Sequence, residues 1–226
     1  MRKIIVFIVF ALLITTLKPA NAQDKALKKG FSINLITGFP SPENYGLEGL
    51  DPDLENRLLI GLEIGNRWYI KPQEKYGFGI MLNWFDISLQ FSEVDPPKEA
   101  SNNRTNVFNI SLLEVGPIGT YAITPNIGID AYYNIRPTYM KTSIYLDQGW
   151  YGTGEGYDVD DEAAMGFTHT CGLSIRRKAL ALSLEYLFGN IRTVDELSFD
   201  NGDWSLDYGT KHLSSNHFRI MIGFKF

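Results

Sequence analysis

The chain has 226 residues, of which 44% are hydrophobic, and a formal net charge of -5 at pH 7. The acidic balance argues against a nucleic-acid partner, and the single cysteine, Cys171, excludes an intramolecular disulfide. After residue 22, no apolar stretch approaches the roughly 20 residues that a transmembrane helix requires. A membrane-spanning form of this chain would therefore consist of strands closed into a barrel.

The N-terminus has the pattern of an export signal. Arg2 and Lys3 precede an apolar run over residues 4–14, and Ala20-Asn21-Ala22 supplies the small residues typical of a cleavage site. We expect residues 1–22 to be a signal peptide cleaved near Ala22, and residues 23–226 to form one domain. Gln23, not a cysteine, directly follows the expected cleavage site, so we do not expect a lipid anchor.

Eight segments of the mature sequence alternate apolar and polar side chains, as strands with one apolar face do. In chain order they are 30–39, 57–70, 76–91, 106–123, 127–139, 165–176, 180–188 and 218–226. The apolar phase changes within the third segment, which predicts a bulge near Phe85-Asp86. Neither phase is apolar throughout the fourth segment, where we expect a bulge or bend at Gly116-Pro117.

The connectors between these segments alternate between long and short. Long polar connectors are expected at residues 40–56, 92–105, 146–164 and 189–211, and short ones at 71–75, 124–126 and 177–179. Long external loops and short periplasmic turns are typical of outer-membrane barrels. With eight strands, both termini would lie on the side of the short turns.

The last segment has one apolar face, formed by Phe218, Ile220, Ile222, Phe224 and Phe226, and ends the chain on an aromatic residue. It resembles the closing strand of Gram-negative outer-membrane β-barrels, in which a terminal Phe is typical and is recognised by the assembly machinery. Phe224 and Phe226 would be the membrane-insertion signal.

The whole pattern resembles small outer-membrane barrels, a class that includes the OmpA-type membrane domain. The resemblance implies an all-β, eight-stranded antiparallel up-and-down transmembrane barrel in the cell outer membrane, with outer-membrane lipids and the barrel-assembly machinery as partners. A soluble lipocalin-type barrel would also alternate, but with its apolar face inward. Aromatic residues near the strand ends favour the membrane barrel.

Charged residues recur on the face opposite the lipid: Glu63, Asp130, Arg136, Arg176, Glu185, Arg219 and Lys225. An eight-stranded barrel is just wide enough for side chains to fill it, and an unpaired buried charge costs several kcal/mol. We therefore predict an ionic network that forms a structural plug across the lumen. A narrow path for ions or solutes is the alternative.

His212 and Ser214 would share one face of a strand. Lipid A deacylases of the outer membrane carry a similar His-x-Ser stretch, and the resemblance implies ester hydrolysis by a base beside a hydroxyl group, with a carboxylate that orients the base. No carboxylate follows the stretch here, so Glu185 or Glu196 would have to serve. Our main prediction is a protein without a catalytic site or cofactor, and the hydrolase is an alternative.

The third long connector is rich in acids: Asp147, Glu155, Asp158, Asp160, Asp161 and Glu162. Such carboxylates could bind Ca²⁺, but their spacing does not match an EF-hand loop, so we predict no metal site. Trp150, Tyr151 and Tyr157 add aromatic surface that could contact an extracellular ligand. The functional prediction is a barrel that acts as a platform for four external loops, in envelope integrity or surface interaction.

Overall fold

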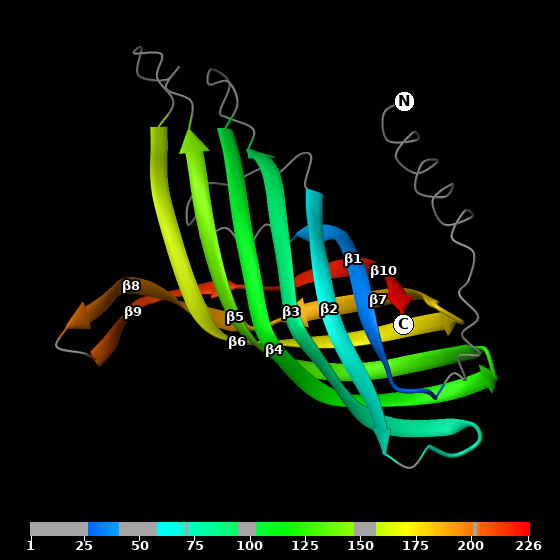
Figure 1. Cartoon of the computed structure of the whole chain (residues 1–226). Coiled ribbons are helices and arrows are strands. Elements are labelled where there is room, and N and C mark those ends of the chain that lie inside the picture. The colour runs from blue at the N-terminus through cyan, green and yellow to red at the C-terminus, as the bar shows by residue number, and fades with distance from the viewer. Residues whose placement is uncertain (1–26, 41–57, 71, 95–102, 147–156, 201–202) are drawn as a thin grey trace, which may run out of the picture.

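The computed structural model describes residues 27–40, 58–70, 72–94, 103–146, 157–200 and 203–226 (Figure 1). The strands are β1 (Gly30–Pro40), β2 (Leu58–Ile70), β3 (Tyr76–Val94), β4 (Asn103–Thr124), β5 (Ile127–Leu146), β6 (Tyr157–Arg177), β7 (Leu180–Phe188), β8 (Asn190–Asp200), β9 (Asp203–Ser214) and β10 (His217–Lys225). Among these residues, no helix is long and apolar enough to cross a membrane. The predicted signal peptide at residues 1–22 lies outside the described residues.

The strands form one antiparallel sheet that closes on itself. Their order is β5-β4-β3-β2-β1-β10-β7-β6-β8-β9, and an additional pairing of β5 with β6 closes the barrel. The first and last strands, β1 and β10, lie side by side (Figure 1). Only Gly189 separates β7 from β8, and only Ser215 and Asn216 separate β9 from β10, so each pair continues as one barrel strand. The predicted eight-stranded antiparallel barrel is therefore confirmed.

The short connectors lie where the sequence predicted them. Residues 71–75 join β2 to β3, Pro125 and Asn126 join β4 to β5, and Lys178 and Ala179 join β6 to β7. At the opposite end, the predicted connectors 92–105 and 146–164 are shorter than expected, because β3, β4 and β6 extend into them. The acids Asp158, Asp160, Asp161 and Glu162 lie in β6, whereas Asp147 and Glu155 lie outside the described residues.

The fourth long connector was predicted wrongly. Residues 189–211 are not a loop but mostly a hairpin of β8 and β9, joined through residues 201–202. The polar composition suggested a loop, but the two strands pair with each other from Asn190–Ser214 to Asp200–Asp203. The hairpin pairs with β6 only at Ala164–Thr193 and Met165–Arg192, and Figure 1 shows it extending away from the loop ends of β3 to β6.

Two bulges change which side chains face inward. In β3, Ile64 pairs with Phe85 and Gly65 pairs with Asn83, so the predicted bulge is confirmed at Trp84. In β4, the register against β5 shifts between Ser111 and Val115, so the bend expected at Gly116-Pro117 was placed wrongly.

The bulge in β4 has a left-handed backbone at Leu113, whose φ is 56°. As a result, Leu112 and Leu113 both face outward and Glu114 is fully buried inside. A bulge inserts an extra residue and thereby reverses the alternation that follows it. Residues 106–123 showed no continuous apolar face because the bulge, which exchanges inward and outward positions, lies in the middle of this segment.

Candidate functional site

The barrel is polar inside and apolar outside. Along β10, Arg219 and Met221 are each 1% exposed, whereas Phe218 is 54% exposed. The free thiol of Cys171 also lies on the outer wall. Because a protein in water buries its apolar side chains and exposes its charged ones, this inverted arrangement is that of a wall that contacts lipid.

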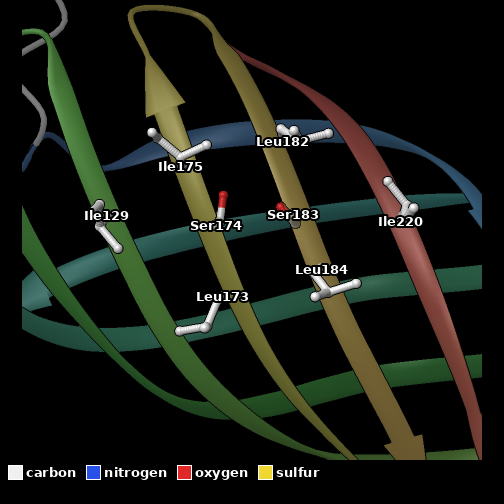
Figure 2. A pocket seen from close by; sticks show the side chains of 8 residues that line it. All are labelled: Ile129, Leu173, Ser174, Ile175, Leu182, Ser183, Leu184 and Ile220. Carbon is white, nitrogen blue, oxygen red and sulfur yellow. The ribbon is translucent and has the colours of Figure 1, made fainter.

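A shallow apolar groove of about 350 Å³ on this wall has the same arrangement, with apolar side chains outside and polar ones inside (Figure 2). Its aliphatic lining is formed by Ile129, Leu173, Ile175, Leu182, Leu184 and Ile220. Ser174 and Ser183 pair across β6 and β7 at its floor and are buried. The groove is the space between successive aliphatic rungs, so we assign it to lipid contact.

Aromatic rings gather at two levels of the outer wall. Toward the loop end, rings stack in series across four strands, from Tyr133 through His169, Phe188 and Tyr186 to Phe218. His169 is held there by a 2.6 Å hydrogen bond between its Nδ1 and the hydroxyl of Tyr133. At the short-turn end, Phe31 lies against Phe226 and Tyr76 against Tyr121. Two such levels are typical of the aromatic girdles that flank the apolar band of a membrane barrel.

The lumen contains a buried ionic group that we call the upper cluster, composed of Glu63, Asp86, Glu114, Arg136, Glu185 and Arg219. Arg219 lies at its centre. Its Nε pairs with Glu185, its Nη1 pairs with Asp86, and its Nη2 lies 3.4 Å from Glu63 Oε2. One guanidinium group therefore joins carboxylates from three other strands.

Arg136 is the second cation of the upper cluster. Its Nη2 lies 2.9 Å from Asp86 Oδ2 and donates to Ser111 Oγ at 3.1 Å. Its Nε lies 2.8 Å from Glu114 Oε1, but the two atoms are not aligned for a hydrogen bond. Asp86 Oδ2 thus accepts from both arginines of the cluster.

Neutral side chains also donate to the carboxylates of Glu63, Glu114 and Glu185. Asn34 donates to Glu63 Oε1 at 2.5 Å, and Asn83 donates to both Glu63 and Glu114, at 2.8 and 3.1 Å. The hydroxyl of Tyr132 donates to Glu185 Oε1 at 2.6 Å. Hydrogen bonds to charged groups are among the strong ones in proteins, so these contacts fix the carboxylates in place.

Nearer the short turns lies a lower cluster of Arg67, Asp130 and Arg176. Asp130 accepts from both arginines, at 2.8 Å from Arg67 Nη1 and 2.8 Å from Arg176 Nη2. It also accepts from Thr120 Oγ1 at 2.6 Å, and Arg176 donates to the Tyr69 hydroxyl at 3.0 Å. At the C-terminus, on the same side as the short turns, the buried Lys225 donates from Nζ to the carbonyl oxygen of Lys28 at 2.6 Å.

Apolar layers separate these groups along the barrel axis. The inward positions of β5 run from Asp130 through Tyr132 and Asn134 to Arg136 and then Met140. Tyr132 packs with Met81 and Ile118 between the two clusters. Above the upper cluster, Met140 belongs to a buried apolar group with Val107, Ala164, Ile191 and Leu213. In the described lumen, apolar groups therefore lie between and above the two ionic clusters, together with neutral polar side chains such as Asn134 and Thr138.

The predicted lumen residues divide between these groups. Arg136, Glu185, Arg219 and Glu63 lie in the upper cluster, Asp130 and Arg176 lie in the lower cluster, and Lys225 is buried at the short-turn end. Sequence reasoning missed three charged members: Arg67, Asp86 and Glu114. The phase of Arg67 matches that of Glu63, so it could have been found, whereas the other two follow the bulges in β3 and β4.

The structure does not bring together the residues of the hydrolase hypothesis. His212 and Ser214 share the outward face of β9, as expected, and Ser214 Oγ accepts from the backbone N–H of Asn216 at 3.4 Å. Glu185 lies inside the lumen, bound to Arg219 and Tyr132. Glu196 lies in β8 opposite Asp207. A carboxylate held by the lumen network cannot orient a base on the outer wall, so Glu185 is excluded from this role.

The fold and the inverted polarity define a small eight-stranded β-barrel of the transmembrane type. Comparison by sequence gives no matching family model and no matching curated protein. Two solved structures of Ail, the attachment invasion locus protein of Yersinia pestis, are similar in fold; one contains the heparin analogue sucrose octasulfate. They match at 11% identity, with TM-scores of 0.39 and 0.38, over 88% of this chain and 97% of theirs.

A third similar structure is outer membrane protein H (OprH) from P. aeruginosa, determined in DHPC micelles. It matches at 17% identity, with a TM-score of 0.25, over 87% of this chain and 99% of its own.

Proposed function

We propose that the protein is an integral outer-membrane β-barrel whose closed lumen makes it a rigid platform for its external connections, acting in envelope integrity or surface interaction. The observation that carries this proposal is the inverted barrel, with an apolar outer wall around buried ion pairs. A polar interior filled by paired charges suits a scaffold. Binding would then belong to the loop end of the barrel, including the β8–β9 hairpin and the connections that carry Trp150 and Tyr151.

The proposal includes the processing and insertion of the chain. Residues 1–22 would direct export and be removed near Ala22, and the assembly machinery would recognise the strand that ends in Phe224 and Phe226. The C-terminal edge supports this role, because Phe226 is 71% exposed and lies against Phe31 on the outer wall. Its ring contributes to the outer surface and not to the lumen.

The layered lumen favours a plug over a path for ions or solutes. Arg219 and Arg136 pair with carboxylates from four strands, β2, β3, β4 and β7, and apolar side chains lie above and below them. The purified, refolded barrel should therefore give no steady conductance in a planar bilayer. A stable single-channel conductance whose ion preference changes in Arg219→Met would identify the lumen as a path and contradict the plug.

The topology can be tested with epitope tags in intact cells. A tag inserted after Gly149, in the connection from β5 to β6, should bind antibody without permeabilisation. A matched tag inserted after Asn126, in the short turn between β4 and β5, should bind only after permeabilisation. The opposite pattern would reverse the proposed orientation, and loss of both tags from the membrane fraction would contradict outer-membrane insertion.

A further inference from the structure

The upper cluster has an excess of negative charge. Its four carboxylates, Glu63, Asp86, Glu114 and Glu185, are matched by two guanidinium groups, those of Arg136 and Arg219. The lower cluster has the opposite imbalance, with two arginines around Asp130. The apolar group of Met81, Ile118 and Tyr132 lies between the two clusters. In a low-dielectric interior, charge must be balanced locally.

Two carboxylate oxygens of the upper cluster also lack an aligned hydrogen-bond donor. Asp86 Oδ1 is buried without a hydrogen-bond partner among the described residues, and Glu114 Oε1 has only the misaligned ion pair with Arg136. Asp86 is 1% exposed and uses its other oxygen for both arginines. A buried acceptor without a partner is costly, so these atoms are suited to a positively charged ligand.

The geometry matches a small cation. One carboxylate oxygen from each of Glu63, Asp86 and Glu114 lies within 4.8 Å of the other two. Hard divalent cations bind carboxylate oxygens at about 2.0–2.6 Å, so an ion among three such oxygens could contact all of them. Glu185 is not part of this group of three, and Tyr132 and Arg219 hold its two oxygens.

We propose that Glu63, Asp86 and Glu114 form a buried binding site for one divalent cation of the Ca²⁺ or Mg²⁺ class, which neutralises the upper cluster. The three ligands come from β2, β3 and β4, so the ion would tie neighbouring strands together inside the barrel. Apolar side chains cover the cluster at both ends, which means that the ion would be enclosed as the barrel closes. This inference concerns the interior only, and it is independent of what the loops bind.

Metal content after refolding tests the proposal directly. Urea-unfolded chain is refolded into detergent micelles with CaCl₂ or MgCl₂, or with EDTA, and the barrel is then passed through a chelator-equilibrated column. Elemental analysis of the wild type should give about one ion per chain, because a site enclosed by the barrel exchanges slowly. The barrel refolded with metal should also withstand heating to a higher temperature than the barrel refolded with EDTA.

Two variants that each remove one formal charge separate the site from general charge effects. Glu114→Gln removes a proposed ligand and should lose the bound ion together with the stabilisation by metal. Glu185→Gln removes a carboxylate that lies in the same cluster but outside the triad, and it should retain the ion.

Two results would overturn the site. One is a wild-type barrel that elutes without metal and unfolds at the same temperature in CaCl₂, MgCl₂ and EDTA, since its acids would then be neutralised by protons. Another is a wild-type metal content that Glu114→Gln retains in full. If Glu114→Gln does not refold, the wild-type comparison with and without EDTA decides alone, and equal behaviour in the two rejects the site.

Discussion

Replacing Arg219 by Met removes the central cation of the lumen and tests whether the ion pairs are buried and structural. Arg219 contacts Glu185, Asp86 and Glu63, but its loss would not orphan all three equally. Asp86 keeps Arg136, and Glu63 keeps its two asparagine donors. Glu185 would keep the Tyr132 hydroxyl but lose its charged partner.

The expected loss of unfolding free energy follows from the contacts that each carboxylate keeps. Glu185 and Glu63 both lose their only guanidinium partner among the described residues, but the Glu63 contact is long, at 3.4 Å. The main cost is therefore that of breaking the buried Glu185 pair, about 3–5 kcal/mol. It is not three times this value, because the other two carboxylates retain donors. We expect the free energy of unfolding, measured by urea titration of the barrel in lipid vesicles, to fall by this amount in Arg219→Met. Arg192→Met, the same change at an exposed arginine of β8, should alter it by less than about 0.5 kcal/mol.

The double variant Arg219→Met/Glu185→Gln completes a thermodynamic cycle. The new glutamine side chain would still accept from Tyr132 but would carry no charge, so the double variant should recover about 1–3 kcal/mol relative to the sum of the single variants. A loss below about 1 kcal/mol in Arg219→Met, together with no coupling to Glu185, would refute a dry ionic plug. It would indicate that water reaches Arg219 and screens the pair.

Three further predictions concern the wall, a turn and the C-terminus. Leu184→Arg, in the middle of β7, should lower the free energy of unfolding by about 2–4 kcal/mol, whereas Leu180→Arg near the turn should cost about 0–1 kcal/mol; similar costs would contradict the proposed membrane position. Lys178 has a φ of 54°, so Lys178→Gly should raise the free energy of unfolding by about 0.5–1 kcal/mol and Ala179→Gly should not. Deletion of Phe226 should leave export intact but reduce the folded, heat-modifiable barrel in the outer-membrane fraction; undiminished insertion would contradict its role as a signal.

The alternation of side chains predicted most of the barrel because it is a local property. On β10, inward Arg219 and Met221 alternate with outward Phe218 and Ile220, and this period of two can be read without knowing the neighbouring strands. The short turns could be predicted for the same reason. The hairpin of β8 and β9 was not predicted, because the polar composition of residues 189–211 indicated a loop.

The composition of the lumen clusters was harder to predict, because it depends on register. Asp86 and Glu114 follow the bulges in β3 and β4, so simple alternation from the start of each strand assigns them to the wrong side. The partners of Arg219 and Arg136 could not be read either. Which acid meets which base across a lumen is set by the stagger of the strands, and a single sequence does not contain that stagger in readable form.

The two bulges are one structural feature. In β3, Trp84 and Phe85 are consecutive non-lumen residues, and in β4, Leu112 and Leu113 are consecutive outward residues. The pairing of β3 with β4 keeps one register on both sides of this level, from Asn83–Glu114 to Phe85–Leu112. Each strand is instead shifted against its other neighbour, β2 or β5.

A phase change in β3 alone would therefore place inward residues opposite outward ones along the rest of the β3–β4 pair, since a slip of one residue exchanges the two faces of a strand. The matching extra residue in β4 prevents this conflict and turns Asp86 and Glu114 to the same side, where Arg136 reaches both. The phase change visible in residues 76–91 thus required a second one in the strand that pairs with it. That requirement explains why the segment 106–123 showed no continuous apolar phase, and why the acids of the upper cluster converge.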